Sequence, residues 1–199
     1  MNALRWAWIV IAALVSSCAS TPPHFHTLVR EPDPTPFGAS AAEVQLTVDA
    51  VKIPAQVDRL ELVTRLPDGG IAIADGERWI APLADELGNA LSIELLRRLS
   101  RRDPGHAGGS NSVSVRLNVQ RFESSANRYA LIEASWHLEL KEGGSDVRVV
   151  CRTRAYEEVS GGYPQLVRGY QRAVAEIAGE IATVVQDSIG GVAADCPRG

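Results

Sequence analysis

The side chains with the widest chemical repertoire in this chain are three cysteines and four histidines. A cysteine sulfur can carry a lipid, join a second cysteine or bind a metal, depending on its surroundings. No nucleophile-elbow, zinc-protease or phosphate-loop motif accompanies these residues. We therefore expect no catalytic residues and no bound cofactor, and we ask what the cysteines are for.

Cys18 follows an unusual N-terminal segment. Arg5 precedes nine apolar residues, Trp6 to Leu14, and Val15-Ser16-Ser17 then leads into the cysteine. Nine helical residues are too short for a hydrocarbon core of about 30 Å, whereas a basic start, a short apolar core and small residues are typical of a secretory signal peptide. The order aliphatic, small, small, cysteine is similar to a bacterial lipobox. That resemblance implies removal of residues 1–17 and a lipid anchor on Cys18; the alternative is an ordinary signal peptide with a chance cysteine.

The residues after Cys18 suit a tether. Several acyl chains hold a protein at a bilayer far better than one chain does. Ala19, and not an acidic residue, stands second in the mature chain, which by resemblance to bacterial lipoproteins implies sorting to the outer membrane. Prolines throughout residues 18–42 favour an extended backbone. Within this segment "HFHTL" indicates a short first strand beginning at His24.

The two remaining cysteines have two possible roles. In an oxidising compartment Cys151 and Cys196 can form a disulfide bond. Alternatively, Cys151 is a reduced residue buried in a strand and Cys196 is a loose residue of the tail. The histidines suggest little chemistry: His24 and His26 would share one side of a strand and could bind a metal weakly, but we expect no metal site.

Length and charge bound the class of protein. The chain has 199 residues and a formal net charge of −4, which fits one domain with a real core and gives no electrostatic case for binding nucleic acid. We expect a signal peptide at 1–17, a lipidated N-terminus with linker and first strand at 18–42, one domain at 43–191 and a C-terminal tail at 192–199.

Hydrophobic periodicity predicts the elements of that domain. Alternating apolar and polar residues indicate strands, and steps of three and four indicate amphipathic helices. The expected strands lie within 42–54, 59–66, 71–79, 111–122, 128–140 and 147–159. The expected helices lie at 81–99 and 163–187. This order predicts an α+β two-layer sandwich, with one mostly antiparallel sheet and both helices packed on one face.

Several segments together resemble a known family. A strand ending in "IPAQVDR", a strand reading "LVTR", "ERWIAPL" at the start of a helix and a last helix beginning "YPQLVRGYQRAVAEIAGEIA" follow the pattern of the ABC-type transport auxiliary lipoproteins, the PqiC-like envelope lipoproteins. The resemblance covers essentially the whole chain after Cys18. Two segments depart from the family pattern, "HFHTL" near the start and "RFESS" after the strand within 111–122.

The resemblance implies a role without enzymatic activity. Such lipoproteins accompany MCE-domain proteins and an ABC-type permease and ATPase in moving lipids between two membranes. This chain would then sit on the periplasmic face of the outer membrane and dock the periplasmic transport protein, and the resemblance also implies a ring-shaped homo-oligomer. Arg59, Arg65 and Trp79 match the family pattern, and we interpret them as structural: the arginines capping turns and the tryptophan joining strand to helix.

Two other hypotheses stay open at this point. An assembly lipoprotein, such as a pilotin or secretion-pore subunit, would share the anchor and the α+β body. A periplasmic enzyme would need polar side chains clustered in a concave pocket. In addition, Arg148, Arg152 and Arg154 point away from the predicted core, either as a solvated face or as a face that binds a partner.

Overall fold

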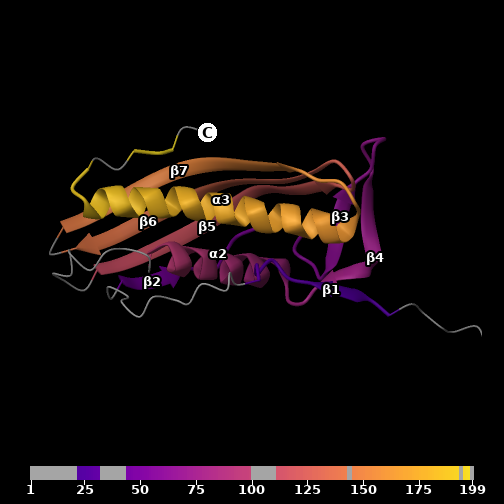
Figure 1. Cartoon of the computed structure of the whole chain (residues 1–199), viewed down its shortest axis with the longest axis horizontal. Coiled ribbons are helices and arrows are strands. Elements are labelled where there is room, and N and C mark those ends of the chain that lie inside the picture. Colours follow the sequence, from indigo (N-terminus) through magenta and orange to yellow (C-terminus); the bar gives the residue numbers. More distant parts are fainter. Residues whose placement is uncertain (1–21, 32–43, 100–110, 143–144, 193–194, 198–199) are drawn as a thin grey trace, which may run out of the picture.

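The computed structural model describes residues 22–31, 44–99, 111–142, 145–192 and 195–197, and Figure 1 shows their arrangement. The proposed signal peptide, Cys18 and His106 lie outside these residues. The described helices are α2 (Leu83–Leu99) and α3 (Tyr163–Ile189). The described strands are β1 (His24–His26), β2 (Val44–Val48), β3 (Glu61–Arg65), β4 (Ile71–Trp79), β5 (Asn111–Ser125), β6 (Tyr129–Glu142) and β7 (Ser145–Glu158).

The strands form two sheets. In the large sheet the order is β2-β5-β6-β7, and in the small sheet it is β1-β4-β3. The pairs β3–β4, β5–β6 and β6–β7 are antiparallel, whereas β1 pairs parallel with β4 and β2 pairs parallel with β5. The α+β sandwich predicted from the sequence is confirmed, whereas the expectation of one mostly antiparallel sheet is wrong, because two mixed sheets are present.

The large sheet and the two helices make the main core. Both helices lie on one face of the large sheet (Figure 1). Alternate residues of β5, β6 and β7 point toward the helices and are buried, as their period of two requires. The predicted apolar stripe of α3 is buried throughout, from Leu166 to Val185. Of the helices within the described residues, none is long and apolar enough to cross a membrane.

A bulge in the pairing of β5 with β6 lets the main core extend to one end of the large sheet. The pairing of β5 with β6 shifts between Val119 and Arg121. A bulge adds one residue to a strand and so reverses which later residues face inward. As a result Val119 and Phe122 are both buried, while Arg121 between them is exposed.

The small sheet stands at this end of the sandwich, where β3, β4 and β1 meet the start of α3 (Figure 1). Leu62 and Ala74 are directly paired and face the core. The pairing shifts between Glu61 and Leu62, so that β4 bulges before it continues to Trp79. β1 pairs with this last part of β4, which brings the segment that follows Cys18 into the folded body.

Candidate functional site

The segment after the proposed lipid anchor is fastened to both helices. We call residues 24–31 and the side chains that hold them the anchor junction. β1 lies along β4, with His26 opposite Trp79, and the amide of Ile80 donates a hydrogen bond to the carbonyl of His26. Leu28 is 1% exposed and belongs to the main hydrophobic core.

Glu86 of α2 is the centre of the anchor junction. Its Oε2 accepts hydrogen bonds from the Thr27 hydroxyl at 2.7 Å and from the Leu28 amide at 2.8 Å. Only 4% of Glu86 is exposed, and a buried carboxylate needs such donors to offset its lost hydration. From α3, Gln171 donates its amide to the carbonyl oxygens of Thr27 at 3.0 Å and Val29 at 3.4 Å.

A second buried acid holds the end of the same segment. Glu94, two turns after Glu86 on α2, is also 4% exposed. Its Oε1 lies 3.1 Å from Nη1 of Arg97 and 3.5 Å from Nε of Arg30. Arg97 also donates to the Arg30 carbonyl at 3.3 Å. The carboxylates of Glu86 and Glu94 on α2 therefore hold residues 27–30 at both ends.

The two histidines of β1 share one carboxylate. Nδ1 of His24 lies 3.1 Å from Oε1 of Glu77, and Nε2 of His26 lies 2.5 Å from Oε2. Burial opposes ionisation of Glu77, but the hydrogen bonds from His26 and His24 prevail and lower the pKa of this carboxyl group. The described residues hold no cluster of three or more histidine, cysteine or acidic side chains arranged to bind a metal ion.

A pocket of about 320 Å³ opens where the small sheet meets β5. It is mostly apolar, with charged residues around it. The residues that line it are Pro54, Gln56, Val57, Val63, Thr64, Arg65, Ile71, Gln120, Arg121, Phe122, Glu123 and Ser124. Pockets of this size hold small apolar or amphiphilic molecules, and nothing else at this site indicates catalytic chemistry.

Glu123 links the two sheets beside that pocket. It accepts hydrogen bonds from Arg65 of β3 at 2.7 Å, from the Tyr129 hydroxyl at 2.5 Å and from Arg121 at 3.2 Å. The bond from Arg65 is the largest cause that lowers the pKa of Glu123, to about 2, against the opposing effect of burial. Burial and the ionised Glu123 in turn raise the pKa of Tyr129.

Behind the pocket three aromatic rings pack together. Trp79 meets Phe122 and Tyr170 edge to face at 6.3 and 6.2 Å between centroids, and Phe122 stacks on Tyr170 at 4.1 Å. These rings join β4, β5 and α3 in one cluster. Full burial raises the pKa of Tyr170 far above its ordinary value.

The residues that matched the family pattern take separate places. Trp79 is 2% exposed and lies in the aromatic cluster. Arg65 donates to the Gly69 carbonyl at 3.2 Å in the β3–β4 turn as well as to Glu123. Arg59 donates to Glu61 at 2.9 Å on the surface. The structure does not bring these three residues together into one site.

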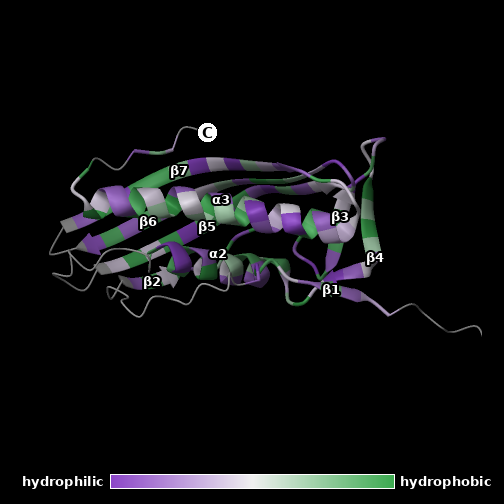
Figure 2. Cartoon of the chain, viewed as in Figure 1, coloured by the Kyte–Doolittle hydropathy of each residue, from purple (hydrophilic) through white to green (hydrophobic). Residues whose placement is uncertain are grey.

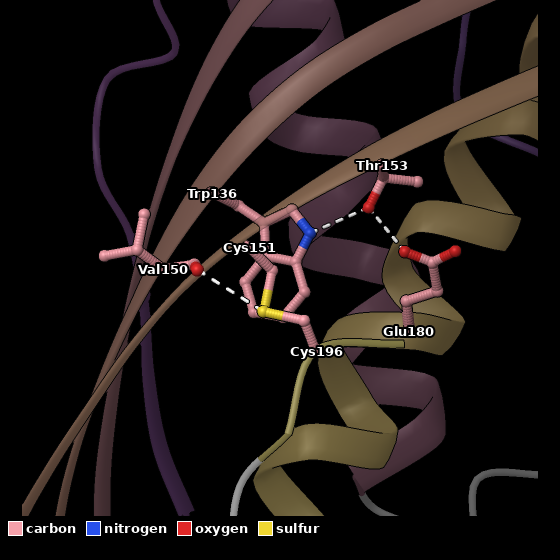
Figure 3. The surroundings of a disulfide bond; sticks show 6 residues. All are labelled: Trp136, Val150, Cys151, Thr153, Glu180 and Cys196. Atoms are coloured by element: carbon pink, nitrogen blue, oxygen red, sulfur yellow. Dashed lines mark hydrogen bonds between the residues drawn. A yellow bond between two sulfur atoms is a disulfide. The ribbon is translucent and has the colours of Figure 1, made fainter. Parts of the chain in front are cut away.

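Cys151 and Cys196 are joined by a disulfide, with 5.4 Å between their Cα atoms (Figure 3). The bond holds the C-terminal segment against β7. Trp136 lies beside it and donates its indole N–H to Thr153 at 2.8 Å, and the Thr153 hydroxyl in turn donates to Glu180 of α3 (Figure 3). This chain of hydrogen bonds ties β6 and β7 to the helix layer.

The outward arginines of β7 lie on the face of the large sheet away from the helices. Arg148 is near Glu139 at 3.8 Å, and Arg154 donates to Glu133 at 3.1 Å while lying 5.5 Å from the Tyr156 ring centroid. Arg152 on the same face is exposed. Both the solvated and the partner-binding interpretations fit this arrangement.

Sequence reasoning missed the acids of the anchor junction. Glu86 and Glu94 both fall within the apolar stripe of α2, between Leu83, Leu87 and Leu95. An acid on the buried face of an amphipathic helix needs a partner, and that was the available signal. Gln171 carried no comparable signal, because its partners are backbone carbonyls 144 and 142 residues away.

Comparison with known proteins defines the family. The model of the ABC-type transport auxiliary lipoprotein component matches residues 26–182. No match was found among curated proteins. A crystal structure of an uncharacterized protein aligns with a TM-score of 0.56 and 18% identity, covering 83% of this chain and 99% of that one. A Xanthomonas campestris protein of the DUF330 family aligns with a TM-score of 0.53 and 15% identity, covering 83% and 95%.

The family match spans most of the folded body, from the end of β1 well into α3. The chain therefore belongs to the ABC-type transport auxiliary lipoprotein family. At their low identity the two crystal structures show that the fold is shared. The family description makes the protein a lipoprotein of a transport-associated class and associates it with an ABC-type transport system.

Proposed function

We propose that this protein is a non-enzymatic lipoprotein of the outer membrane that serves an MCE/ABC-type system for lipid transport between two membranes. In this role a lipid on Cys18 holds the chain at the periplasmic face of the membrane. The folded body docks the MCE-domain protein, which connects it to an ABC permease and ATPase. The family supports the transport role, and the sequence around Cys18 supports the anchor.

The anchor junction is the observation that carries this proposal. A leash without a mechanical role needs no buried contacts, yet residues 24–31 are held by Glu86, Glu94 and Gln171. A force on the anchor is therefore transmitted directly to both helices and, through them, to the large sheet. A body that must hold a transport protein at a fixed position near a membrane requires such a rigid connection.

Crosslinking in intact cells tests the proposed partner. The full chain, carrying a C-terminal affinity tag, is crosslinked, extracted in detergent and analysed by mass spectrometry. We expect an MCE-domain protein or its ABC transporter among the crosslinked proteins. A Cys18→Ser variant is the matched control, because it keeps the folded body and loses the anchor; we expect it to leave the outer-membrane fraction.

Other recovered partners would change the function. A secretin or pilus component in place of the transport proteins would make the protein an assembly lipoprotein. Retention of the Cys18→Ser variant in the outer-membrane fraction would contradict the lipid anchor itself. Copies of this chain crosslinked to each other would indicate a homo-oligomer and would leave the transport role to be decided by the other partners.

A further inference from the structure

One end of the molecule exposes an unusual amount of apolar surface. Ten large apolar side chains are exposed within the described residues, and six of them belong to the small sheet or adjoin its strands. The most exposed of the six are Ile80 at 66%, Phe25 at 62%, Ile71 at 59% and Ile73 at 45%. Figure 2 shows hydrophobic bands along β4 at this end.

The strand register places these four side chains on one side of the small sheet. Leu62 and Ala74 face the core, so Ile73 and Ile71, which alternate with Ala74 and Ala72, face away from it. Beyond the bulge Arg78 pairs with Glu61, which lies on the same side of β3 as Val63, the partner of Ile73. Phe25 pairs with Arg78, and Ile80 is two residues after Arg78, so both lie on this side as well. We call Phe25, Ile71, Ile73 and Ile80 the apolar end face.

Phe25, one residue of the apolar end face, is close to Cys18 along the chain. Six peptide units separate Cys18 from His24 of β1, and they can span at most about 20 Å when fully extended. The long strands of the large sheet have 14 or 15 residues and run for roughly 45 to 50 Å. Phe25, next to His24, therefore stays near the lipid while the far end of the sandwich can point away.

We propose that the apolar end face lies against the lipid surface and orients the body end-on to the membrane. This inference rests on the lipid anchor of the proposed function, but not on the identity of the transport partner. Isolated apolar residues on a surface are ordinary. A group of them on the part of the body that is tethered to a bilayer can instead contact the lipid. The apolar pocket at this end, which Ile71 lines, adds to the surface that lipid would cover.

The charges nearby predict what kind of lipid contact this is. Arg78 lies 3.6 Å from Glu61, Arg65 pairs with Glu123, and His24 pairs with Glu77. Because these cations already have acidic partners, they offer little attraction to anionic headgroups. The contact should therefore depend on apolar insertion, and it should be similar on neutral and anionic bilayers.

Native tryptophan fluorescence can test the orientation. Removal of residues 1–17 leaves Trp79 and Trp136 in the chain. Trp79 lies roughly 5 to 10 Å beneath the apolar end face, on the other side of the small sheet. Trp136 lies four residues along β6 from Ile132, the residue paired with Phe122, which places it about 13 Å farther along the strand.

The lipidated full chain is reconstituted in phosphatidylcholine vesicles with and without brominated acyl chains, which quench tryptophan at short range. A Trp136→Phe variant reports on Trp79, and a Trp79→Phe variant reports on Trp136. We expect at least twofold stronger quenching of Trp79. The result should not change when phosphatidylglycerol is added. Thermal melts and intact mass establish that each variant is folded and that Cys18 carries lipid.

A matched pair of substitutions tests the face itself. Ile71→Thr with Ile73→Thr keeps strand propensity but removes apolar surface, and should reduce quenching of Trp79 to the level of Trp136. Val150→Thr makes the same kind of change at a β7 position with the same 59% exposure as Ile71, and should have no effect.

Three results would overturn the proposal. Equal quenching of the two tryptophans would mean that the body lies on its side or moves freely above the bilayer. Crosslinks between copies through the apolar end face would make that face a protein interface. A folded chain without lipid on Cys18 would remove the tether on which the inference depends. None of these results would by itself exclude an MCE-domain partner, which the crosslinking experiment decides separately.

Discussion

The large sandwich and the small-sheet end of this protein are built on different principles. In the large sandwich, β5, β6 and β7 present apolar residues to α3 along most of their length, and fully buried side-chain hydrogen bonds, such as the one from Trp136 to Thr153, are few within the described residues. At the small-sheet end, short strands are held by ion pairs and by buried acids. Apolar side chains there face outward as well as inward.

This difference suggests separate roles: the large sandwich supplies stability, and the small-sheet end holds the segment that follows Cys18. Apolar burial is non-directional and tolerant of exchange, so it suits a body that has only to stay folded. Hydrogen-bonded carboxylates are directional and tie particular residues together. The small-sheet end receives the segment that follows Cys18, and directional contacts of this kind keep that segment in one position.

The largest effect should come from the disulfide of the large sandwich. Replacing Cys151 with Ala and Cys196 with Ser opens a cross-link between residues 45 apart in sequence. We expect a loss of about 2–4 kcal/mol in the free energy of unfolding, measured by urea denaturation. Reduction of the unmodified chain should produce a similar loss, and intact mass should increase by two hydrogen atoms because each sulfur becomes a thiol. Two alkylatable thiols without reductant would contradict the bond.

A substitution of Glu123 tests the connection between the large sandwich and the small sheet. Glu123→Gln should lower the free energy of unfolding at pH 7 by at most about 3 kcal/mol, because the pKa of Glu123 is lowered from 4.5 to about 2 in the folded state. A lowered pKa stabilises the fold above the unfolded pKa. The difference between the two proteins should therefore shrink as pH falls from about 4.5 to 2.

Denaturation curves of both proteins across this pH range measure the effect. Glu139→Gln is the control, because Glu139 is an exposed acid on the outer face of β6 whose ion pair with Arg148 is long, at 3.8 Å, and exposed to solvent. A stability difference for Glu123→Gln that stays constant from pH 7 to pH 2 would mean that ionisation of Glu123 does not connect the sheets.

The smallest and most local effect should come from Glu86. Glu86→Ala leaves the buried Leu28 amide without its acceptor, a loss of about 1–3 kcal/mol that falls mainly on residues 24–31. Hydrogen exchange should therefore accelerate tenfold or more in that segment and remain unchanged in α3. Asn89→Ala, at an exposed position of the same helix, should alter neither region. Equal acceleration in both regions would show that the anchor junction and the sandwich unfold together.

Much of the fold could be predicted because its signals are local. The strand hairpin 61–79, the three long strands and both helices follow from alternation, turn residues and helical spacing. The two-sheet arrangement could not be predicted in this way. It depends on β1 joining β4 and β2 joining β5, parallel pairings between residues tens of positions apart, and on the bulge before Trp79.

The candidate site was predicted less completely. Arg65 and Trp79 were singled out and do hold structure together, but nothing in the sequence paired them with Glu123 and Tyr170, although Tyr170 lies in the predicted apolar stripe of the last helix. His24 and His26 were considered as weak metal ligands, and in the structure one ring nitrogen of each contacts the carboxylate of Glu77. That carboxylate comes from β4, 51 residues beyond His26.

The sequence by itself determined the family, the α+β class, the periods of the elements and the spacing of a cysteine after a short apolar segment. These are properties of neighbouring residues, and neighbours in the chain stay neighbours in any fold. Only the tertiary structure decided that Glu86 and Gln171 hold residues 24–31, that Cys196 reaches Cys151, and that four exposed apolar side chains share one side of the small sheet. Each of these depends on segments distant in sequence, which packing of the whole chain brings together.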